Sequence, residues 1–565
     1  MERLTSIVDR PRGGRSLASR RRAPEQKPSV RDLQDPASRL AGRVNAYLKD
    51  LAARGELGRY TGSIGDAQER IESLLGASPD VVLRRIRIGA DAARPALLTY
   101  VDGMTDDDLL QATIARLQDA AWHAPTVQGT GDAAEGAVQA LLSVGGVQRE
   151  DRWSTLLTQL LYGTALLFVE GIATAWMLDT TKLPARSVGT PQSEPSVKGP
   201  QEAFTEVLFN NLSQIRHHIR DTRIEFDTCT VGSYTKTTVA LAHVRGLTNP
   251  DLVLAVQHRL QSIDRDYVQY ANEVSPYLHD HPRSLFPLVR STERVDWAVR
   301  DLMNGKVVVI VDGDPFVLSL PVSVMDFFQT TQDYIFSAWE ASLVRVVRLM
   351  GVLLGLYLMP LYIALFSVNP GLVPTKLVLA VAGARQHIPF PPIMEVAIMW
   401  IIIEVLREAA NRLPQPLATT LGTVGAVVVG TAIVKAGIVD PIMIVLVTLS
   451  AIGLFTIPAY EMGAAFRWMF WVMVGGASVL GVLGVILVTV ALIGYLSALE
   501  TFGVPYFAPF APILPSDLGD TLVRAPLPWL RKRPVTNHPL DHWKSAPMKR
   551  LEPVELEDIQ GTDLP

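Results

Sequence analysis

The chain has 565 residues, a net charge of −4 and a single cysteine, Cys229. The acidic balance argues against nucleic acid as a partner, because phosphate binding needs a concentrated basic face. One cysteine excludes an intramolecular disulfide and a cysteine-based zinc site, so we expect Cys229 to be a bystander. At about 150 residues per domain, this length predicts roughly three domains.

Residues 1–55 are rich in arginine, serine and proline, and we interpret them as a disordered basic tail. No apolar run follows the stretch "SRRRAPEQKP", so no secretory signal peptide is expected. The next domain should therefore remain on the cytoplasmic side of a membrane. The tail itself suits either contact with anionic lipid or simple exposure to solvent.

Charged and apolar residues are mixed up to about residue 348, as in a soluble protein, and helix signals alternate there with strand signals. We expect a first lobe over 56–182, a linker rich in Pro, Ser and Gly over 183–200, and a second lobe over 201–340. The predicted fold class of this half is α/β (α+β), in two lobes.

Two acid–glycine pairs, Glu170-Gly171 and Asp312-Gly313, each stand between two β-prone runs. Such a pair is the strongest short-range signal of a β-hairpin, so each lobe should contain one. Asp312 and Asp314 could also be read as metal ligands or an acid–base pair, but turn chemistry already explains both residues.

The sequence offers no clear catalytic centre. His217 and His218 are adjacent, and neighbours on a helix point about 100° apart, so the two imidazoles cannot chelate one ion together. No phosphate-binding loop, dinucleotide fingerprint or nucleophile elbow occurs in a usable context. We therefore expect no enzymatic activity, no cofactor and no metal, and interpret both lobes as built for contacts.

The most apolar third, residues 341–500, is predicted to be an all-α polytopic membrane domain. A crossing helix needs about 20 mostly apolar residues. The last stretch is long enough for one tilted helix or for a broken pair. The four expected spans lie at about 345–366, 417–437, 441–460 and 468–499.

Basic residues flank this third at both ends, at Arg345 and Arg348 and again at Arg531–Arg533. Because lysine and arginine collect on the cytoplasmic side, both ends should lie inside, which requires an even number of crossings. The element 391–412 would then be re-entrant, and a full fifth crossing is the competing topology. Residues 501–565 are predicted to be a cytoplasmic tail.

The element 391–412 carries charges that are costly in lipid. Glu404 and Glu408 lie one helical turn apart with Arg407 beside them, whereas Glu395 faces the opposite side. These groups, with Lys435, form either part of an aqueous ion path or a structural polar cluster, such as a Glu404–Arg407 pair. On the first interpretation, Glu408 is left free to act.

Several separated motifs resemble one known family, the A subunits of GerA-type spore germinant receptors, over about 64–534. They occur in "GPQEAFTEVLFNNLSQIRHHIRD", in "STERVDW", in "PFPPIMEVAIMWIIIEVLREAANRLPQP" and in "FGVPYFAPFAPILPSDLGDTLVRAPLPWLRKRP". Val295 and Leu288 depart from the family pattern. The matching residues outside the glutamate cluster include Glu206, Arg216, Glu293, Arg294, Asp296, Pro391, Pro392, Pro505, Tyr506, Asp520 and Arg524.

The resemblance implies a multi-pass subunit of the spore inner membrane with both termini cytoplasmic. Its implied partners are a transporter-like B subunit, a lipoprotein C subunit, membrane lipid and further copies of itself in a homo-oligomer. The implied function is a nutrient-gated ion channel that triggers germination. The alternatives are a related subunit that amplifies ion release with the dipicolinic-acid channel, and a non-conducting membrane scaffold.

Overall fold

The computed structural model describes residues 58–75, 78–88, 94–119, 147–181, 190–412 and 430–545. The expected tail 1–55 and most of the expected span 417–437 lie outside these residues. Tyr60–Asp151 and Thr155–Pro565 belong to one compact unit, and Arg59 with Arg152–Ser154 to another. The contacts below are all within the larger unit.

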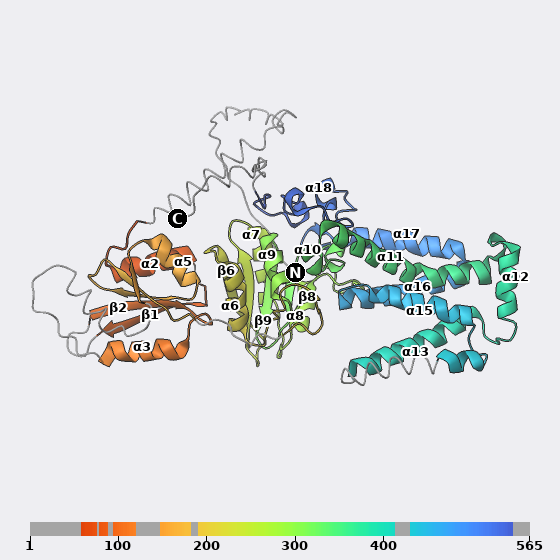
Figure 1. Ribbon diagram of the computed structural model, residues 1–565, viewed down its shortest axis with the longest axis horizontal. Helices are drawn as coiled ribbons and strands as arrows, with labels where there is room; N and C mark the ends of the chain where they lie inside the picture. The colour runs from red at the N-terminus through yellow and green to blue at the C-terminus, as the bar shows by residue number, and fades with distance from the viewer. Residues whose placement is uncertain are drawn as a thin grey trace, which may run out of the picture. The chain divides into compact units, whose positions relative to one another are not determined.

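The first lobe contains a five-stranded antiparallel sheet in the order β1-β2-β4-β5-β3 (Figure 1). β4 is the central strand, and it is buried throughout because both of its faces are covered. The strands are β1 (Val81–Ile88), β2 (Arg94–Val101), β3 (Gln148–Glu150), β4 (Ala165–Val169) and β5 (Ala175–Leu178), and the helices are α2 (Ile64–Leu75), α3 (Asp107–Asp119) and α5 (Trp153–Leu161).

The second lobe contains another five-stranded antiparallel sheet, in the order β6-β7-β9-β10-β8. One face packs on α6 and α9, and the other on α7 and α8. Its elements are α6 (Leu208–His218), β6 (Ile224–Val231), β7 (Thr237–Val244), α7 (Pro250–Gln261), α8 (Ala271–Leu278), β8 (Arg290–Thr292), α9 (Val295–Met303), β9 (Val307–Val311) and β10 (Val317–Leu320).

The two sheets share one topology, since their strands follow the same spatial order relative to the chain. Both predicted hairpins are present, β4–β5 around Glu170 and β9–β10 around Asp312. In each, the acidic side chain accepts a hydrogen bond from the first turn of the lobe's leading helix: Glu170 from Ile64 N at 3.0 Å and Asp312 from Leu208 N at 3.1 Å. Both acidic residues therefore have a structural role in a hairpin turn, as turn chemistry predicts. The repetition of one topology in the two lobes is evident only from the structure.

After the second lobe the described chain is mostly helical, and these helices share one hydrophobic core with neighbouring loop residues. Among the described residues, two helical stretches are long and apolar enough to cross a membrane, Ala338–Val368 and Tyr460–Leu480. The helices are α11 (Ala338–Ile363), α12 (Thr375–Ala384), α13 (Pro392–Arg412), α15 (Pro441–Phe455), α16 (Tyr460–Leu480) and α17 (Val482–Ala498).

Helix boundaries differ from the expected spans, and two of the differences bear on the topology. The expected span 468–499 is broken at Gly481, whose φ of +63° is accessible to glycine but costly for other residues. The outcome is the broken pair, α16 and α17, which run antiparallel. The expected re-entrant element is one continuous helix, α13, of 21 residues. At 1.5 Å per residue it is about 31 Å long, similar to the thickness of a bilayer core.

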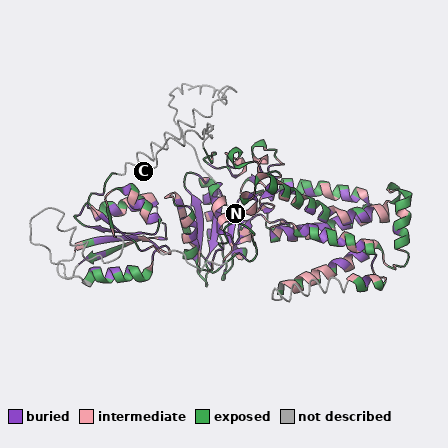
Figure 2. Ribbon diagram, viewed as in Figure 1, coloured by how far each residue is buried: buried purple, intermediate pink, exposed green. Residues whose placement is uncertain are grey.

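Glycines let the helices approach closely, as small residues do in membrane bundles. A Cβ on Gly453 of α15 would meet the Gly351 carbonyl oxygen of α11, and one on Gly484 of α17 would meet the Gly476 carbonyl oxygen of α16. The outer faces of the helices are largely exposed (Figure 2), and many large apolar side chains lie on them. On α17 the exposed side chains include Leu483, Ile486, Leu487, Val490 and Ile493.

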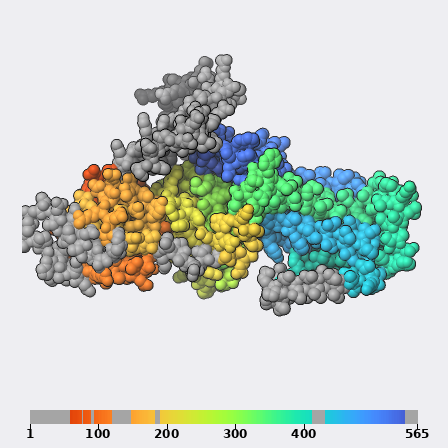
Figure 3. All heavy atoms as spheres, in the orientation of Figure 1, coloured from red at the N-terminus to blue at the C-terminus, as the bar shows by residue number. Residues whose placement is uncertain are grey.

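Both ends of the helical region meet at the second lobe. Thr501 Oγ1 donates to Val322 O at 2.9 Å and joins the chain after α17 to the chain after β10. The following residues, including α18 (Pro515–Leu518), lie against the base of the helices (Figure 3). The described part of the expected tail is therefore packed on the protein.

Candidate functional site at the base of the helical region

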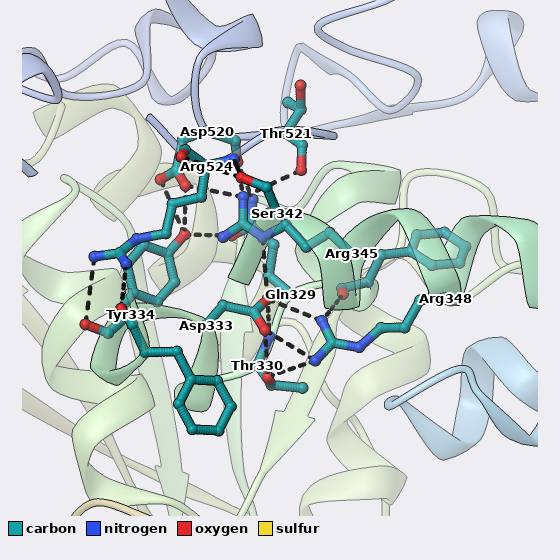
Figure 4. A network of polar contacts seen from close by, with 12 residues as sticks. Gln329, Thr330, Asp333, Tyr334, Ser342, Arg345, Arg348, Asp520, Thr521 and Arg524 are labelled. Carbon is teal, nitrogen blue, oxygen red and sulfur yellow. Dashed lines mark hydrogen bonds and ion pairs between the residues drawn. The ribbon is translucent and has the colours of Figure 1, made fainter. Parts of the chain in front are cut away.

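A network of buried polar contacts joins three segments at this base (Figure 4). They are the short helix α10 (Gln332–Ile335) with the residues beside it, the first turns of α11, and the chain after α18. We call this the junction network. Its members are Gln329, Thr330, Asp333, Tyr334, Ser342, Arg345, Arg348, Asp520, Thr521 and Arg524.

Asp333 lies at the centre of the junction network with a fully buried side chain. Arg348 donates to it through Nη1 at 2.8 Å and Nη2 at 2.9 Å, and Arg345 Nε donates at 3.1 Å. Burial alone would raise the pKa of Asp333, but the hydrogen bonds and positive charge of Arg348 and Arg345 outweigh it and hold that pKa below its usual value. The carboxylate thus ties α10 to α11.

Asp520 brings the C-terminal segment into the same network. Arg345 Nη1 donates to its main-chain carbonyl at 2.9 Å and to its carboxylate at 3.1 Å. Tyr334 donates its hydroxyl to the same carboxylate at 2.9 Å. Arg524 Nη1 donates to Phe336 O at 2.7 Å. Arg345 therefore connects two acidic residues that are 187 positions apart in the sequence.

A stack of rings and guanidinium groups links the junction network to α9 of the second lobe. Arg300 lies 3.2 Å from the ring centroid of Tyr334 and 4.8 Å from that of Trp297. On its other side, Trp297 has the Arg290 guanidinium 3.7 Å from its ring centroid. Because cation–π contacts gain strength when they are desolvated, these contacts hold α9 against α10.

The Thr292-Glu293-Arg294 stretch holds the end of the linker. Glu293 accepts hydrogen bonds from Ser193 N at 2.5 Å and Ser193 Oγ at 2.6 Å. Arg294 donates to Glu194 O at 3.1 Å and Pro200 O at 2.8 Å, and it pairs with Asp296 at 2.7 Å. The described part of the expected linker, 190–200, is thus fixed to the second lobe.

Residues 69–536 match the model of one protein family, described as Bacillus/Clostridium GerA spore germination protein. The chain belongs to this family. Its relatives include spore germination protein KA of Bacillus subtilis (strain 168), 32% identical over 87% of this chain and 89% of the relative. Spore germination protein B1 of the same organism is 34% identical over 84% of this chain and 98% of the relative.

Among solved structures, this chain is similar to the N-terminal domain of the A subunit of the Bacillus megaterium spore germinant receptor GerK3. The two share 26% identity, and the match covers 47% of this chain and 96% of that one. The TM-score is 0.37, too low to equate the two folds. The resemblance expected from the motifs is confirmed by the family match itself.

The GerA motif residues of the two N-terminal lobes serve mainly as structural anchors. Arg216 is fully buried and pairs with Asp80 of the first lobe, Nε to Oδ2 at 2.5 Å. The side chain of Glu206 is exposed, and its main-chain carbonyl accepts from Gly313 N at 2.8 Å. Cys229 is half-buried, and burial raises the pKa of its thiol, which disfavours a reactive thiolate.

The proline and tyrosine motif residues mark chain ends and turns. Pro392 is the first residue of α13, where a missing N–H costs nothing, and Pro391 O accepts from Met394 N at 2.9 Å. Pro505 lies in the short strand β12 (Val504–Pro505). Tyr506 is fully buried, and its carbonyl accepts from Val324 N at 2.7 Å.

The structure separates the predicted glutamate cluster into two places. Glu404 pairs with Arg407, and Glu408 pairs with Arg412 at 2.6 Å, all on the more exposed half of α13. The prediction that Glu408 is left free is therefore wrong, because Arg412 lies one turn further along the same face.

The other two predicted members lie away from this half of α13. Glu395 is fully buried near the start of the helix, beside Arg385 and Asp440. Lys435 is exposed in the helical stretch 430–435. The five residues thus do not form one cluster.

Sequence reasoning missed several residues that matter here. Asp333 and Tyr334 carry no motif signal of their own, and Asp80 looks like any polar residue before a strand. Arg345 and Arg348 were interpreted only as membrane-flanking charges. The available signal was their spacing of three positions. It puts both guanidinium groups on one face of a helix that follows Asp333 in the chain.

Proposed function

We propose that this GerA-family chain is the A subunit of a nutrient-responsive germinant receptor. In this proposal it forms a homo-oligomeric, nutrient-gated ion channel in the spore inner membrane, together with a transporter-like B subunit and a lipoprotein C subunit. The observation that carries the proposal is the junction network, in which Arg345 joins the second lobe, the first long apolar helix and the C-terminal segment.

The junction network suits signal transfer because it is buried and shared. A movement of α9 or α10 changes the surroundings of Asp333. Because Arg345 and Arg348 of α11 pair with that carboxylate, α11 should move with it. Stranding a buried charge costs about 3–5 kcal/mol, so the segments should move together rather than separate.

The arrangement of helices supports a multi-pass topology with both ends of the helical region on one side. Thr501 and Val322 are hydrogen-bonded to each other, which requires an even number of crossings between them. α13 begins beside Asp440, at the start of α15, and packs alongside α15. We therefore propose that α13 crosses the membrane and that α16 and α17 cross separately. The basic flanks support a cytoplasmic location for the shared side.

The charged half of α13 supports an aqueous path between copies of the chain. The side chains of Glu404 and Glu408 are 46% and 62% exposed in the single chain, so they do not face its own core. Ionisable groups in a membrane region usually face a bundle interior or a water-filled cavity. A ring of chains that turned this half of α13 inward would give the charges such a cavity.

The test is cation flux through the complete receptor reconstituted in liposomes, measured with and without nutrient. We expect flux with the native chain, altered flux with Glu404→Gln or Glu408→Gln, and unchanged flux with the surface variant Glu202→Gln. A native receptor that assembles but never conducts would favour the scaffold. The double variant Glu404→Gln with Arg407→Leu tests the structural alternative. If this double variant restores the assembly that Glu404→Gln loses, and germination is normal, the proposal of an aqueous ion path along α13 is wrong.

The amplifying relative remains the second candidate. It shares the expected architecture but responds to ion release rather than to nutrient, so flux that needs prior ion release and no nutrient would favour it. We also propose that the chain has no enzymatic activity of its own. Turnover of a nucleotide or ester by the purified chain, abolished by Asp312→Ala, would contradict this.

A further inference from the structure

A second buried polar cluster lies at the other end of the helical region from the junction network. Glu395 of α13 pairs with Arg385, the residue after α12, Oε1 to Nη2 at 2.7 Å. Its other oxygen, Oε2, accepts from Asp440 N at 2.9 Å. Asp440 precedes α15 and caps it, since its Oδ1 accepts from Ile442 N at 3.1 Å.

The cluster carries more negative than positive charge. The side chain of Glu395 is fully buried, Asp440 is fully buried as a residue, and Arg385 is the one cation paired with either of them among the described residues. Two carboxylates and one guanidinium leave one uncompensated negative charge. An unpaired charge in a low-dielectric interior is expensive enough that such groups normally acquire a counter-charge.

Two polar atoms in this cluster lack a partner among the described residues. Asp440 Oδ2 is buried and accepts no hydrogen bond, and the Tyr362 hydroxyl of α11 is likewise buried and unpartnered. Tyr362 lies close enough to Arg385, Asp440 and Glu395 to feel their charges, although no hydrogen bond of acceptable geometry joins it to Arg385. Buried oxygens are rarely left unsatisfied, so both atoms point to a missing ligand.

No other side chain nearby supplies the missing positive charge. Lys376, His387 and Lys435 lie on the segments that flank the cluster, but all three are exposed, and none forms an ion pair with Glu395 or Asp440 in the described structure. The segment 413–429, which precedes the helical stretch before Asp440, contains no charged residue. The compensating charge must therefore come from outside these segments.

We propose that this cluster binds one alkali-metal cation, with Asp440 Oδ2 and the Tyr362 hydroxyl as its ligands. A single positive charge balances the cluster, whereas a divalent ion would leave an excess of one. Carboxylate and hydroxyl oxygens are the hard ligands that such cations prefer. The bound ion would hold α11, α13 and α15 together at the end of the helical region remote from the soluble lobes.

The experiment uses the full-length chain in lipid nanodiscs. Sodium or potassium chloride replaces choline chloride at constant ionic strength and pH, and the thermal midpoint is followed by tryptophan fluorescence. Because a ligand that binds only the folded state stabilises it by mass action, the midpoint should rise steadily with the logarithm of cation concentration. Equilibrium binding of radiolabelled sodium or rubidium should approach one ion per chain.

Asp440→Asn keeps the helix cap but removes the charge, and it should abolish both the thermal response and the bound label. Tyr362→Phe should weaken the apparent affinity severalfold, which keeps the test valid if Asp440→Asn does not fold. The matched control is Glu340→Gln, which removes an exposed carboxylate from the first turn of α11 and should leave binding unchanged.

Three results would overturn the proposal. They are a native midpoint equal in choline and alkali chlorides, a response that persists in Asp440→Asn, and a midpoint that rises only on acidification. The last would mean that the cluster holds a proton. None of these measurements involves nutrient or flux, so a negative result here leaves the channel proposal untouched.

Discussion

Arg216 of the second lobe and Asp80 of the first form an ion pair in which both side chains are fully buried. Ser78 completes the contact, since its hydroxyl donates to Asp80 Oδ1 at 2.6 Å. The charges are 136 positions apart and join two lobes of the same topology. The two lobes therefore share a buried electrostatic contact.

We expect Arg216→Met to destabilise the chain strongly, because it leaves the Asp80 carboxylate buried and unpaired. Breaking a buried pair in this way costs about 3–5 kcal/mol. The control is Arg223→Met, which breaks the half-exposed pair with Asp221 and should cost about 0–1 kcal/mol. Denaturant unfolding followed by tryptophan fluorescence measures the free energy of unfolding of both variants. Equal losses would show that the buried pair contributes no more to stability than the half-exposed pair.

The pKa of Asp333 gives a prediction of pH dependence. Because the folded pKa lies below the unfolded value of about 3.9, this carboxylate stabilises the folded state fully above that value. Its contribution should be lost as the pH falls through the folded pKa. Thermal midpoints of the detergent-solubilised chain from pH 6 downward should therefore fall less steeply in Asp333→Asn than in the native chain. Identical acid slopes would contradict the network as described.

Glu293→Ala should release the linker from the second lobe, because Ser193 loses both of its hydrogen bonds to that carboxylate. We expect limited proteolysis to cut within 190–200 several times faster than in the native chain. Glu202→Ala is the control, since it removes only an exposed contact with His218. If both variants are cut at the native rate, the linker is held by other contacts.

Two glycines of one helix provide a matched pair for testing helix packing. A Cβ at Gly484 would meet the Gly476 carbonyl oxygen, whereas a Cβ at Gly494 would meet nothing within 4 Å. Gly484→Ala should therefore separate α16 from α17 and lower the thermal midpoint by several degrees, as overpacking costs about 1–3 kcal/mol. Gly494→Ala should be neutral or slightly stabilising, because alanine favours helix. The reverse order would contradict the antiparallel contact.

Local patterns in the sequence determined much of this protein. The change from mixed to apolar composition separates two sheets from a helical region, and the pairs Glu170-Gly171 and Asp312-Gly313 locate two hairpins. These features follow from burial, periodicity and turn chemistry within about ten residues, so neighbouring residues suffice to predict them. Motifs spread along the chain were enough to identify the GerA family.

Tertiary structure decided which charges meet. Asp333 and Asp520 share Arg345, Asp80 faces Arg216, and Asp440 lies beside Glu395, although each contact joins segments far apart in the chain. An ion pair depends on distance in space and on burial, and neither is encoded by residue type at one position. For the same reason Glu408 was predicted to be free, although its partner Arg412 lies four residues away: helical spacing permits that pair, but only the folded side chains select it.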